Sequence, residues 1–383
     1  MNVLSLFDGM SCGQITLSEL GIPVEKYYAS EVDKFAIKAT MQNFPDTIQL
    51  GDVRELDVSL LDKIDLIIGG SPCTNLSMSG KRKGLSTKEG MEVLDLQTYL
   101  ELKENGFEFE GQSYLFWEYI RIYHELIERG DNPKFFLENV EMGNKWESVF
   151  NETMGRKGIH INSALVSAQN RKRIYWTDIH DDIPQPEDRG ILLKDILEEE
   201  VDEKYFLSDK MIECLKGRVK TENNPICVAM RGRESACLTP RRTEYGKQIR
   251  KEYEAGIVKE QRKNIQQLEP REDGKTNCLT TVQKDNLIIV SGTIRAFGGK
   301  HFREIKSGKS CTLLARARND GNAQPCVQIG EKIRRLTPTE CARLQTVPEW
   351  YIWDGISDTQ RYKMLGNGWN VETIKHIFKY IKQ

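Results

Sequence analysis

A cysteine stands directly after an apolar segment and could act as a nucleophile. Residues 64–68 read IDLII and are followed by GGSPC, which ends at Cys73. An apolar run that ends in glycine and proline is typical of a parallel strand stopping at the carboxyl edge of a sheet, where α/β proteins place their chemistry. A lone cysteine is more often a packed apolar residue than a reactive thiol. Activation would require stabilisation of its thiolate by backbone amides and by cations such as Lys81, Arg82 or Lys83.

Two later segments place an acid and guanidinium groups where they could act with the Cys73 thiol. The sequence FFLENV predicts a strand that ends close to Glu138. In SAQNRKRIYW, Gln169, Arg171 and Arg173 alternate, and side chains two residues apart in a strand point to the same side. A glutamate beside a strand arginine is most often an internal ion pair. Because a nucleophile, an acid and a guanidinium rarely meet at one sheet edge by chance, we predict that Glu138, Arg171 and Arg173 act together with the cysteine.

Two carboxylates follow successive strand-like segments and suit a cofactor that contains a nucleoside. Glu31 comes after YYAS and could accept hydrogen bonds from ribose hydroxyls, and Asp52 could accept one from an adenine amino group. The N-terminal LSLFDGMSCGQ predicts a strand, a turn and a helix, but it matches neither GxGxxG nor the P-loop pattern. We therefore expect no phosphate-binding loop, although the free amides at the start of that helix could hold a carboxylate.

The first half of the chain alternates strand-like and helix-like segments. NVLSLF, YYAS, IDLIIGG and KFFLENV are separated by helical stretches that begin near Ser11 and Asp33 and by an amphipathic helix near residues 114–129. Strands that alternate with helices predict an α/β fold with a doubly wound, mostly parallel sheet. A polar, glycine-containing insert near residues 79–112 interrupts this pattern. From about Pro184 onward the pattern fails.

Composition and charge restrict the class of protein. Residues 211–340 hold 26 Lys and Arg against 15 Asp and Glu, and the rest of the chain holds 29 against 42, although the net charge is only −2. A basic segment in an acidic chain is expected where one part meets a polyanion, and a solvated basic surface would look the same. The nine cysteines contain no CxxC pair, which disfavours a disulfide framework and a zinc cluster.

No segment predicts a membrane span or a secretory signal. No window approaches the roughly 18 consecutive apolar residues that a transmembrane helix needs. The N-terminus MNVLSLFDG lacks a basic segment followed by a long apolar stretch. We therefore expect an intracellular, cytoplasmic protein without a membrane partner.

The motifs stand in the order found in the cytosine-5 DNA methyltransferases, a family that this chain resembles. They are FDGMSCG, SEVD, GDV, GGSPCTNLS, FFLENV, SAQNRKRIYW, RRLTPTECARLQTVPEWY and MLGNGWNVETIKHIF. Several of them, with RKGL, are most similar to the de novo branch. The resemblance implies an S-adenosylmethionine-dependent methyltransferase fold in which residues 1–180, completed by 332–383, form the catalytic and cofactor-binding domain. Residues 181–331 would form a smaller, β-rich target recognition domain, and the insert before Tyr114 is longer than usual.

The resemblance also implies a covalent reaction at cytosine. C5 of cytosine is too weak a nucleophile to take a methyl group directly, and addition of the Cys73 thiolate to C6 turns C5 into an enamine carbon. Glu138, kept protonated in a desolvated pocket, would bond N3 and the exocyclic amine. Arg173 would hold O2, Arg171 would steady the thiolate, and no metal would take part.

S-adenosyl-L-methionine is the cofactor that the resemblance implies, with S-adenosyl-L-homocysteine as the product. Glu31 would bind its ribose. A C-terminal turn would close the cofactor pocket, which requires the final helix to pack beside the first strand. The residues carried over are Phe7, Asp8, Gly9, Met10 and Ser11 for the methionine end, Asp52 and Val53 for adenine, and Asn367, Gly368 and Trp369 for the C-terminal turn.

Double-stranded DNA is the implied partner. The target base must rotate out of the stack to reach the thiol, and the basic surplus of residues 211–340 would supply salt-sensitive affinity. We expect a monomer on DNA. The sequence leaves open whether a restriction enzyme accompanies this protein. The candidates for base reading, among which the sequence does not choose, are Arg231, Arg233, Arg241, Arg242, Arg316 and Arg318.

Three other functions compete with this interpretation. A transfer RNA cytosine-5 methyltransferase shares the chemistry but lacks a large recognition segment. A catalytically inactive DNA-binding regulator is disfavoured because the cysteine, the acid and the arginine are all present. A nicotinamide dehydrogenase is compatible with a parallel sheet, but the chain lacks a diphosphate-binding fingerprint.

Overall fold

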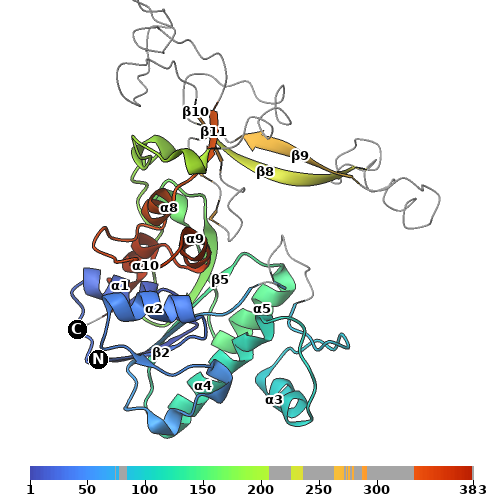
Figure 1. Cartoon of the computed structure of the whole chain (residues 1–383). Helices are drawn as coiled ribbons and strands as arrows, with labels where there is room; N and C mark the ends of the chain where they lie inside the picture. Colours follow the sequence, from blue (N-terminus) through green and yellow to red (C-terminus); the bar gives the residue numbers. More distant parts are fainter. Residues whose placement is uncertain are drawn as a thin grey trace, which may run out of the picture. The chain divides into compact units, whose positions relative to one another are not determined.

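The computed structural model covers most of the chain in detail (Figure 1). Described are residues 1–73, 75–76, 84–206, 226–235, 263–270, 273, 275–276, 278–279, 287–290 and 332–381, with the backbone alone in 226–235, 263–270, 287–290 and 332–333. Two compact units are present, Met1–Ile191 with Cys341–Gln383, and Leu192–Glu340. The predicted domain boundaries, at residues 180/181 and 331/332, stay a prediction. The assignment of the second unit to target recognition stays a prediction.

The first unit is built on a seven-stranded sheet. Its strands are β1 (Asn2–Leu6), β2 (Lys26–Ser30), β3 (Ile48–Gln49), β4 (Leu66–Gly70), β5 (Lys134–Val140), β6 (Ile159–Asn162) and β7 (Lys172–Thr177). They lie in the order β3-β2-β1-β4-β5-β7-β6. β1 to β5 run parallel, and β7 is antiparallel to both β5 and β6. The predicted mostly parallel sheet is confirmed.

The described residues of the two units also form helices. They are α1 (Cys12–Glu19), α2 (Lys34–Asn43), α3 (Leu96–Glu104), α4 (Phe116–Arg129), α5 (Asn144–Met154), α8 (Pro338–Leu344), α9 (Asp358–Asn367) and α10 (Val371–Phe378), with short 3-10 helices η1 (Val53–Glu55), η2 (Val58–Leu60), η3 (Ser113–Leu115), η4 (Ser163–Leu165), η5 (Leu193–Asp195) and η6 (Glu203–Tyr205). Asp33 and Asn370 cap α2 and α10 by accepting from backbone amides. Gly130 ends α4 with a φ of 93°, which glycine adopts readily.

Alternate residues of the central strands pack on opposite faces of the sheet. In β5, Phe135 and Leu137 belong to one buried cluster and Phe136 belongs to the other. α4 and α5 cover the first face, and α1 and α10 cover the second (Figure 1). This is expected where side chains alternate along strands that are buried on both faces. Val3 of β1 and Ile374 of α10 share the second cluster, so the predicted return of the final helix to the first strand is confirmed.

Two features of the first unit differ from the sequence prediction. The insert near residues 79–112 contains the helix α3, which its polar composition did not indicate. β7 begins at Lys172, so the prediction that Gln169 and Arg171 alternate along this strand is wrong. The Arg171 amide donates to the Asn162 side chain at 3.0 Å, while its carbonyl accepts from the Ser163 amide at 2.9 Å.

The second unit contains a four-stranded antiparallel sheet within its described residues. Its strands are β8 (Ile226–Ser235), β9 (Lys263–Pro270), β10 (Leu287–Val290) and β11 (Lys332–Arg335), in the order β11-β10-β8-β9. The β-rich character predicted for this region is present in them. Arg231 and Arg233 belong to β8, of which only the backbone is described. The side chains of all six base-reading candidates lie outside the described residues. Over the described parts of both units, no helix is long and apolar enough to cross a membrane.

Phe378 tests how strongly the final helix stabilises the sheet. It is fully buried and packs edge-on against Phe136 with ring centroids 5.0 Å apart. Phe378→Ala should lower the free energy of unfolding by about 3–5 kcal/mol, because it removes buried apolar surface and leaves a cavity. Urea unfolding measures the change. Lys379→Ala, at the exposed neighbouring position, is the control and should change it by less than about 0.5 kcal/mol; equal effects of the two variants would contradict the packing.

Candidate active site

The carboxyl edge of the parallel strands carries the predicted chemical groups. Leu6 at the end of β1 is in register with Ser30 of β2 and with Gly69 of β4, so the turns that follow these strands begin side by side. Gly70 is in register with Glu138 of β5. The nucleophile candidate Cys73 follows Gly70 by three residues. Sheet register therefore assembles groups that are far apart in the sequence.

Glu138 and Arg173 form an ion pair between two antiparallel strands. Arg173 Nε lies 2.8 Å from Glu138 Oε1, and the two side chains are 14% and 11% exposed. Arg173 is in register with Val140. Because side chains alternate along a strand, the two-residue offset places Arg173 and Glu138 on the same face as diagonal neighbours. A charge-assisted hydrogen bond of this length fixes the orientation of the carboxyl group.

The Cys73 thiol is affected by this pair. Burial raises the pKa of Cys73 above its ordinary value, and the charge of Glu138 raises it further. Arg173 and Arg171 lower the pKa but do not compensate. Cys73 is therefore a protonated thiol at neutral pH in the protein alone, and stabilisation of its thiolate stays a condition for activation. The three cations predicted to assist, Lys81, Arg82 and Lys83, lie outside the described residues.

Hydrogen bonds fix the turn that carries Cys73. Asn139 Nδ2 donates to the carbonyl and hydroxyl oxygens of Ser71 at 3.2 and 3.0 Å. On the other side of Cys73, the Leu76 amide donates to the Cys73 carbonyl at 3.0 Å. Asn139 was absent from the predicted site residues. Its position next to Glu138 in FFLENV was the available signal.

Arg171 ties the C-terminal turn to the same edge. Its side chain is buried and donates to the carbonyl oxygens of Gly366 and Gly368, at 2.8 Å for the latter. Gln345, which is also fully buried, donates from Nε2 to Gly368 at 3.0 Å and to Leu365. Gln345 was not predicted as a site residue, since a glutamine within a helical motif carries no chemical signal by itself.

Trp369 packs against the strand that precedes Cys73. A Cβ placed at Gly70 would lie 2.8 Å from Trp369 Nε1 and 3.1 Å from Glu138 Oε2. Only glycine fits at this position, because any side chain would collide with the indole and the carboxyl group. The indole also lies edge-on to Phe136 at a centroid distance of 5.2 Å. Of the other two residues of this turn, Gly368 is half-buried and Asn367 is exposed.

The turn between β1 and α1 has an unusual backbone. Phe7, Gly9 and Ser11 have φ angles of 59°, 60° and 61°, in a region that residues other than glycine rarely adopt. Glu31 holds this turn, because its Oε2 accepts from the Gly9 amide at 2.8 Å while its Oε1 accepts from the amides of residues 32 and 33. Backbone strain that the surroundings enforce in this way is concentrated at functional sites.

Asp8 in this turn has a buried carboxyl oxygen without a hydrogen-bond partner. Its Oδ1 accepts from the hydroxyls of Ser11 at 3.2 Å and Tyr27 at 2.9 Å, whereas Oδ2 has no partner within the described residues. Burial raises the pKa of Asp8 to about 6, although these hydrogen bonds lower it. A buried polar atom without a partner is expected where a ligand supplies the missing donor. The turn therefore fits a cofactor that carries an ammonium group.

The remaining predicted cofactor residues have structural partners. Met10 is buried, and its carbonyl accepts from the Tyr351 hydroxyl at 2.9 Å. Asp52 accepts from the Arg54 amide at 2.9 Å and forms an ion pair with the Arg54 guanidinium, which lowers the pKa of this carboxyl. Val53 is buried in the core, and its role toward adenine stays a prediction. Both carboxylate oxygens of Asp52 accept from Arg54, so a ligand at Asp52 would have to compete with this residue.

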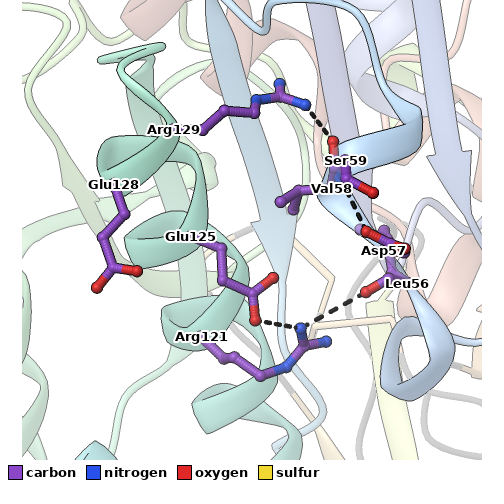
Figure 2. Close-up of a pocket in the computed structure, with 8 residues that line it drawn as sticks. All are labelled: Leu56, Asp57, Val58, Ser59, Arg121, Glu125, Glu128 and Arg129. Carbon is purple, nitrogen blue, oxygen red and sulfur yellow. Dashed lines mark hydrogen bonds and ion pairs between the residues drawn. The ribbon is translucent and has the colours of Figure 1, made fainter.

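Among the described residues of the first unit we looked for a metal cluster and for a second chemical site in a hollow. Within the described residues, no group of three or more His, Cys, Asp or Glu is arranged to hold a metal ion. A hollow of about 520 Å³ lies between η1, η2 and α4 (Figure 2) and contains none of the predicted site residues. Arg121 and Arg129 donate there to backbone carbonyls such as those of Leu56 and Leu61. These contacts hold the connection between β3 and β4.

Comparisons with known proteins find a matching family and several relatives. A profile of the C-5 cytosine-specific DNA methylase family matches residues 1–383. The orphan methyltransferase M.SPRI of Bacillus phage SPR is 27% identical over 464 aligned residues, covering 99% of this chain and 97% of that protein. The type II methyltransferase M1.ScrFI of Lactococcus lactis subsp. cremoris is 28% identical over 378 residues, covering 92% and 71%.

Solved structures support the fold. The Entamoeba histolytica methyltransferase EhMeth is similar with a TM-score of 0.57 at 14% identity, covering 100% of this chain and 97% of that one. The S. pombe Dnmt2 methyltransferase is similar with a TM-score of 0.55 at 16% identity, covering 100% and 98%. The predicted methyltransferase fold is confirmed.

The buried Asp8 carboxyl should make stability depend on pH. Because its pKa is about 6 in the folded state against an ordinary 3.8, the folded protein binds this proton more tightly than the unfolded chain. This contribution is fully present below pH about 4 and is lost as the pH rises through about 6, which lowers the free energy of unfolding by up to about 3 kcal/mol. Asp8→Asn should lack this dependence.

Urea unfolding without added ligands, at several pH values from about 4.5 to 7.5, measures the effect. The difference between wild type and Asp8→Asn isolates this one group, because all other titrations occur in both proteins. Parallel pH profiles of the two proteins would contradict the raised pKa of Asp8.

Proposed function

The chain belongs to the C-5 cytosine-specific DNA methylase family, and on this premise we propose that it is a DNA (cytosine-5-)-methyltransferase. The proposed substrate is a flipped-out cytosine within a specific duplex DNA sequence. The observation that carries the proposal is the position of Cys73 beside the ion pair of Glu138 and Arg173, whose charges both act on its thiol.

Cys73 is the proposed nucleophile. Its sulfur would lose a proton to water and form a bond to C6 of the cytosine, which moves electron density from the C5–C6 double bond toward C5 and N3. C5 then becomes nucleophilic enough to take a methyl group. Loss of the C5 proton to water restores the double bond, breaks the bond between sulfur and C6, and releases the thiolate. Because burial keeps Cys73 protonated, its proton must leave as the base arrives.

Glu138 and Arg173 would polarise the opposite side of the ring. Glu138, once it carries a proton in the complex, would donate to N3 and accept from the exocyclic amine, and Arg173 would donate to O2. The 2.8 Å contact between them supports this role, because each group orients the other before substrate binds. Groups that are already oriented need no reorganisation while charge develops on the ring. Arg171 would act from behind this pair, through its charge and through the C-terminal turn that it holds.

S-adenosyl-L-methionine is the proposed cofactor, and when bound it supplies an electrophilic methyl group. Asp8 Oδ2, which lacks a donor, would accept from the ammonium group of the methionine end. Glu31 would accept from the ribose with the lone pair that its three backbone contacts leave unused. Phe7, Gly9 and Ser11 would shape the methionine end of the pocket through their left-handed backbone.

Duplex DNA is the proposed partner because of the basic surplus in residues 211–340. We infer that this region reads the target sequence and that a monomer binds. The names of the relatives include both orphan and type II methyltransferases, so the comparison supports a role with or without a restriction enzyme. Their phage and bacterial sources support the expectation of action in the bacterial cytoplasm.

The proposal is tested by incubating the protein with methyl-labelled S-adenosylmethionine and mixed-sequence duplex DNA at several salt concentrations. Label at C5 of cytosine is the expected result, with activity that falls steeply as salt rises. If the same assay with transfer RNA in place of DNA gives label on the RNA, and DNA takes none, transfer RNA replaces duplex DNA as the proposed substrate. Absence of label on both would contradict a methyltransferase. Bisulfite sequencing of DNA from expressing cells then gives the recognition sequence.

Cys73→Ser should abolish methyl transfer, because a serine hydroxyl is a far weaker nucleophile at neutral pH than a thiol that can ionise. DNA affinity should stay within about twofold of wild type, since phosphate contacts supply most of it. Wild type should form a stable adduct with duplex DNA containing 5-fluorocytosine, because fluorine at C5 cannot leave as a proton does, and Cys73→Ser should form none. Turnover by the variant would refute the covalent route.

A further inference from the structure

The insert between the nucleophile turn and α4 is a folded element. Ser86 and Thr87 form antiparallel bridges with Glu92 and Phe109. The Lys88 amide donates to the carbonyl of residue 108 at 2.8 Å, and the residue 110 amide donates to that of Ser86 at 2.9 Å. These pairings bring the two ends of the insert together, next to the turn that carries Cys73.

A buried glutamate docks this insert onto α4. Glu118 of α4 is fully buried and accepts from Tyr99 and Lys103 of α3, which packs beside α4 (Figure 1), and from Arg121 Nε at 2.7 Å. Tyr99 also contacts Phe109 with ring centroids 5.0 Å apart. A buried charge held by three donors strongly disfavours separation of the two helices, because separation would break a paired, desolvated network. The insert is therefore fixed to the main sheet through α4.

The far end of the insert contacts the nucleophile turn through Asn75. Asn75 Nδ2 donates to the Glu110 carbonyl at 2.9 Å, and the Asn75 amide donates to Ser113 Oγ at 3.1 Å. Gly111 has a φ of +67°, and a Cβ there would lie 2.7 Å from Asn75 Nδ2. The backbone of the insert is thus shaped to receive this side chain.

Backbone hydrogen bonds next to Asn75 shape the turn that follows Cys73. The Leu76 amide donates to the Cys73 carbonyl at 3.0 Å, and the Gly84 amide donates to the Asn75 carbonyl at 3.1 Å. Gly84 has a φ of +68° and lies against the indole of Trp146, where a Cβ would meet a ring atom at 1.8 Å. Asn75 is 2% exposed, so water cannot replace its partners without movement of the turn.

From these contacts we propose that the insert is a positioning element for the nucleophile and that Asn75 is the positioning residue through which it acts. Asn139 holds the turn before Cys73 from β5, and Asn75 holds the turn after it from the insert. The nucleophile is thereby fixed from two separate elements of the unit. The inference rests on the proposed function, because it takes Cys73 as the nucleophile.

Asn75→Ala and the equally sized Asn75→Asp remove the donor to Glu110. Asn105→Ala is the matched control, since Asn105 Nδ2 also donates to a backbone carbonyl, that of Glu101 at 2.8 Å, but on the exposed surface of the same insert. Alkylation of Cys73 by iodoacetamide, followed by mass spectrometry of its peptide, reports the position of the thiol without DNA or cofactor. The buried Cys341 in the same protein is the internal reference.

Release of the turn should expose the thiol and lower its pKa toward the ordinary value, so alkylation of Cys73 should become about three- to tenfold faster in both Asn75 variants. The rate at Cys341 should not change. Single-turnover methyl transfer at saturating DNA and cofactor should fall by about 10- to 100-fold, because a displacement of the order of 1 Å misplaces the attacking atom. DNA affinity should stay within about twofold.

The proposal is overturned if both Asn75 variants, measured per folded molecule, show the same alkylation and single-turnover rates as wild type. This holds even if the variants are less stable. If wild type transfers no methyl group, the proposed function fails. The alkylation rates would still show whether Asn75 positions the thiol, so the two failures are distinguishable.

Discussion

The parallel register of β1, β2, β4 and β5 is the constraint on which the site depends. Parallel strands end at one edge, and each turn that leaves this edge carries a polar group, namely Asp8, Glu31, Cys73 and, within the last strand, Glu138. The antiparallel strand β7 then adds Arg173 from the opposite direction. An arginine at the start of β7 meets the end of β5 only because the two strands run in opposite directions. The ion pair of Glu138 and Arg173 therefore requires a sheet that contains both parallel and antiparallel strands.

Burial and charge act in opposite directions at Cys73. Burial costs a thiolate more solvation free energy than it costs a neutral thiol. The negative charge of Glu138 disfavours the thiolate further. The two arginines reduce this cost without removing it. The protein alone thus holds a thiol of low reactivity, and a thiolate becomes favourable only as the charge around it changes. A neutral thiol is also less readily oxidised, because oxidation proceeds through the thiolate.

The sheet and the positions of Cys73, Glu138 and Arg173 could be predicted from the sequence, because both depend on local patterns. Apolar runs that end in glycine indicate strand ends, and Cys73, Glu138 and Arg173 follow or occupy such strands. The role of Arg171 toward the C-terminal turn could not be predicted, because its partners Gly366 and Gly368 lie almost 200 positions away. Asn139, Gln345 and Asn75 act through amide hydrogen bonds to backbone atoms, and amide side chains carry no signal that distinguishes such contacts from solvated ones.

The helix in the insert shows a further limit of sequence patterns. α3 has one buried residue, Tyr99, and exposes most of its surface, so it lacks the apolar periodicity by which helices are recognised. It is stabilised instead by the pairing of Lys103 and Tyr99 with Glu118 on another helix. A helix that depends on one buried carboxylate is visible only in three dimensions.

The two turns that matter most are both held by side chains of other segments. A turn at the end of a strand has backbone amides and carbonyls that no ladder satisfies, and buried groups of this kind need partners. Glu31 satisfies the amide of Gly9, and Asn139 satisfies the carbonyl of Ser71. Each net hydrogen bond contributes about 1 kcal/mol, whereas ordering one residue of a turn costs about 1–2 kcal/mol. Since one bond cannot order a turn of several residues, a fixed nucleophile requires contacts on both of its sides.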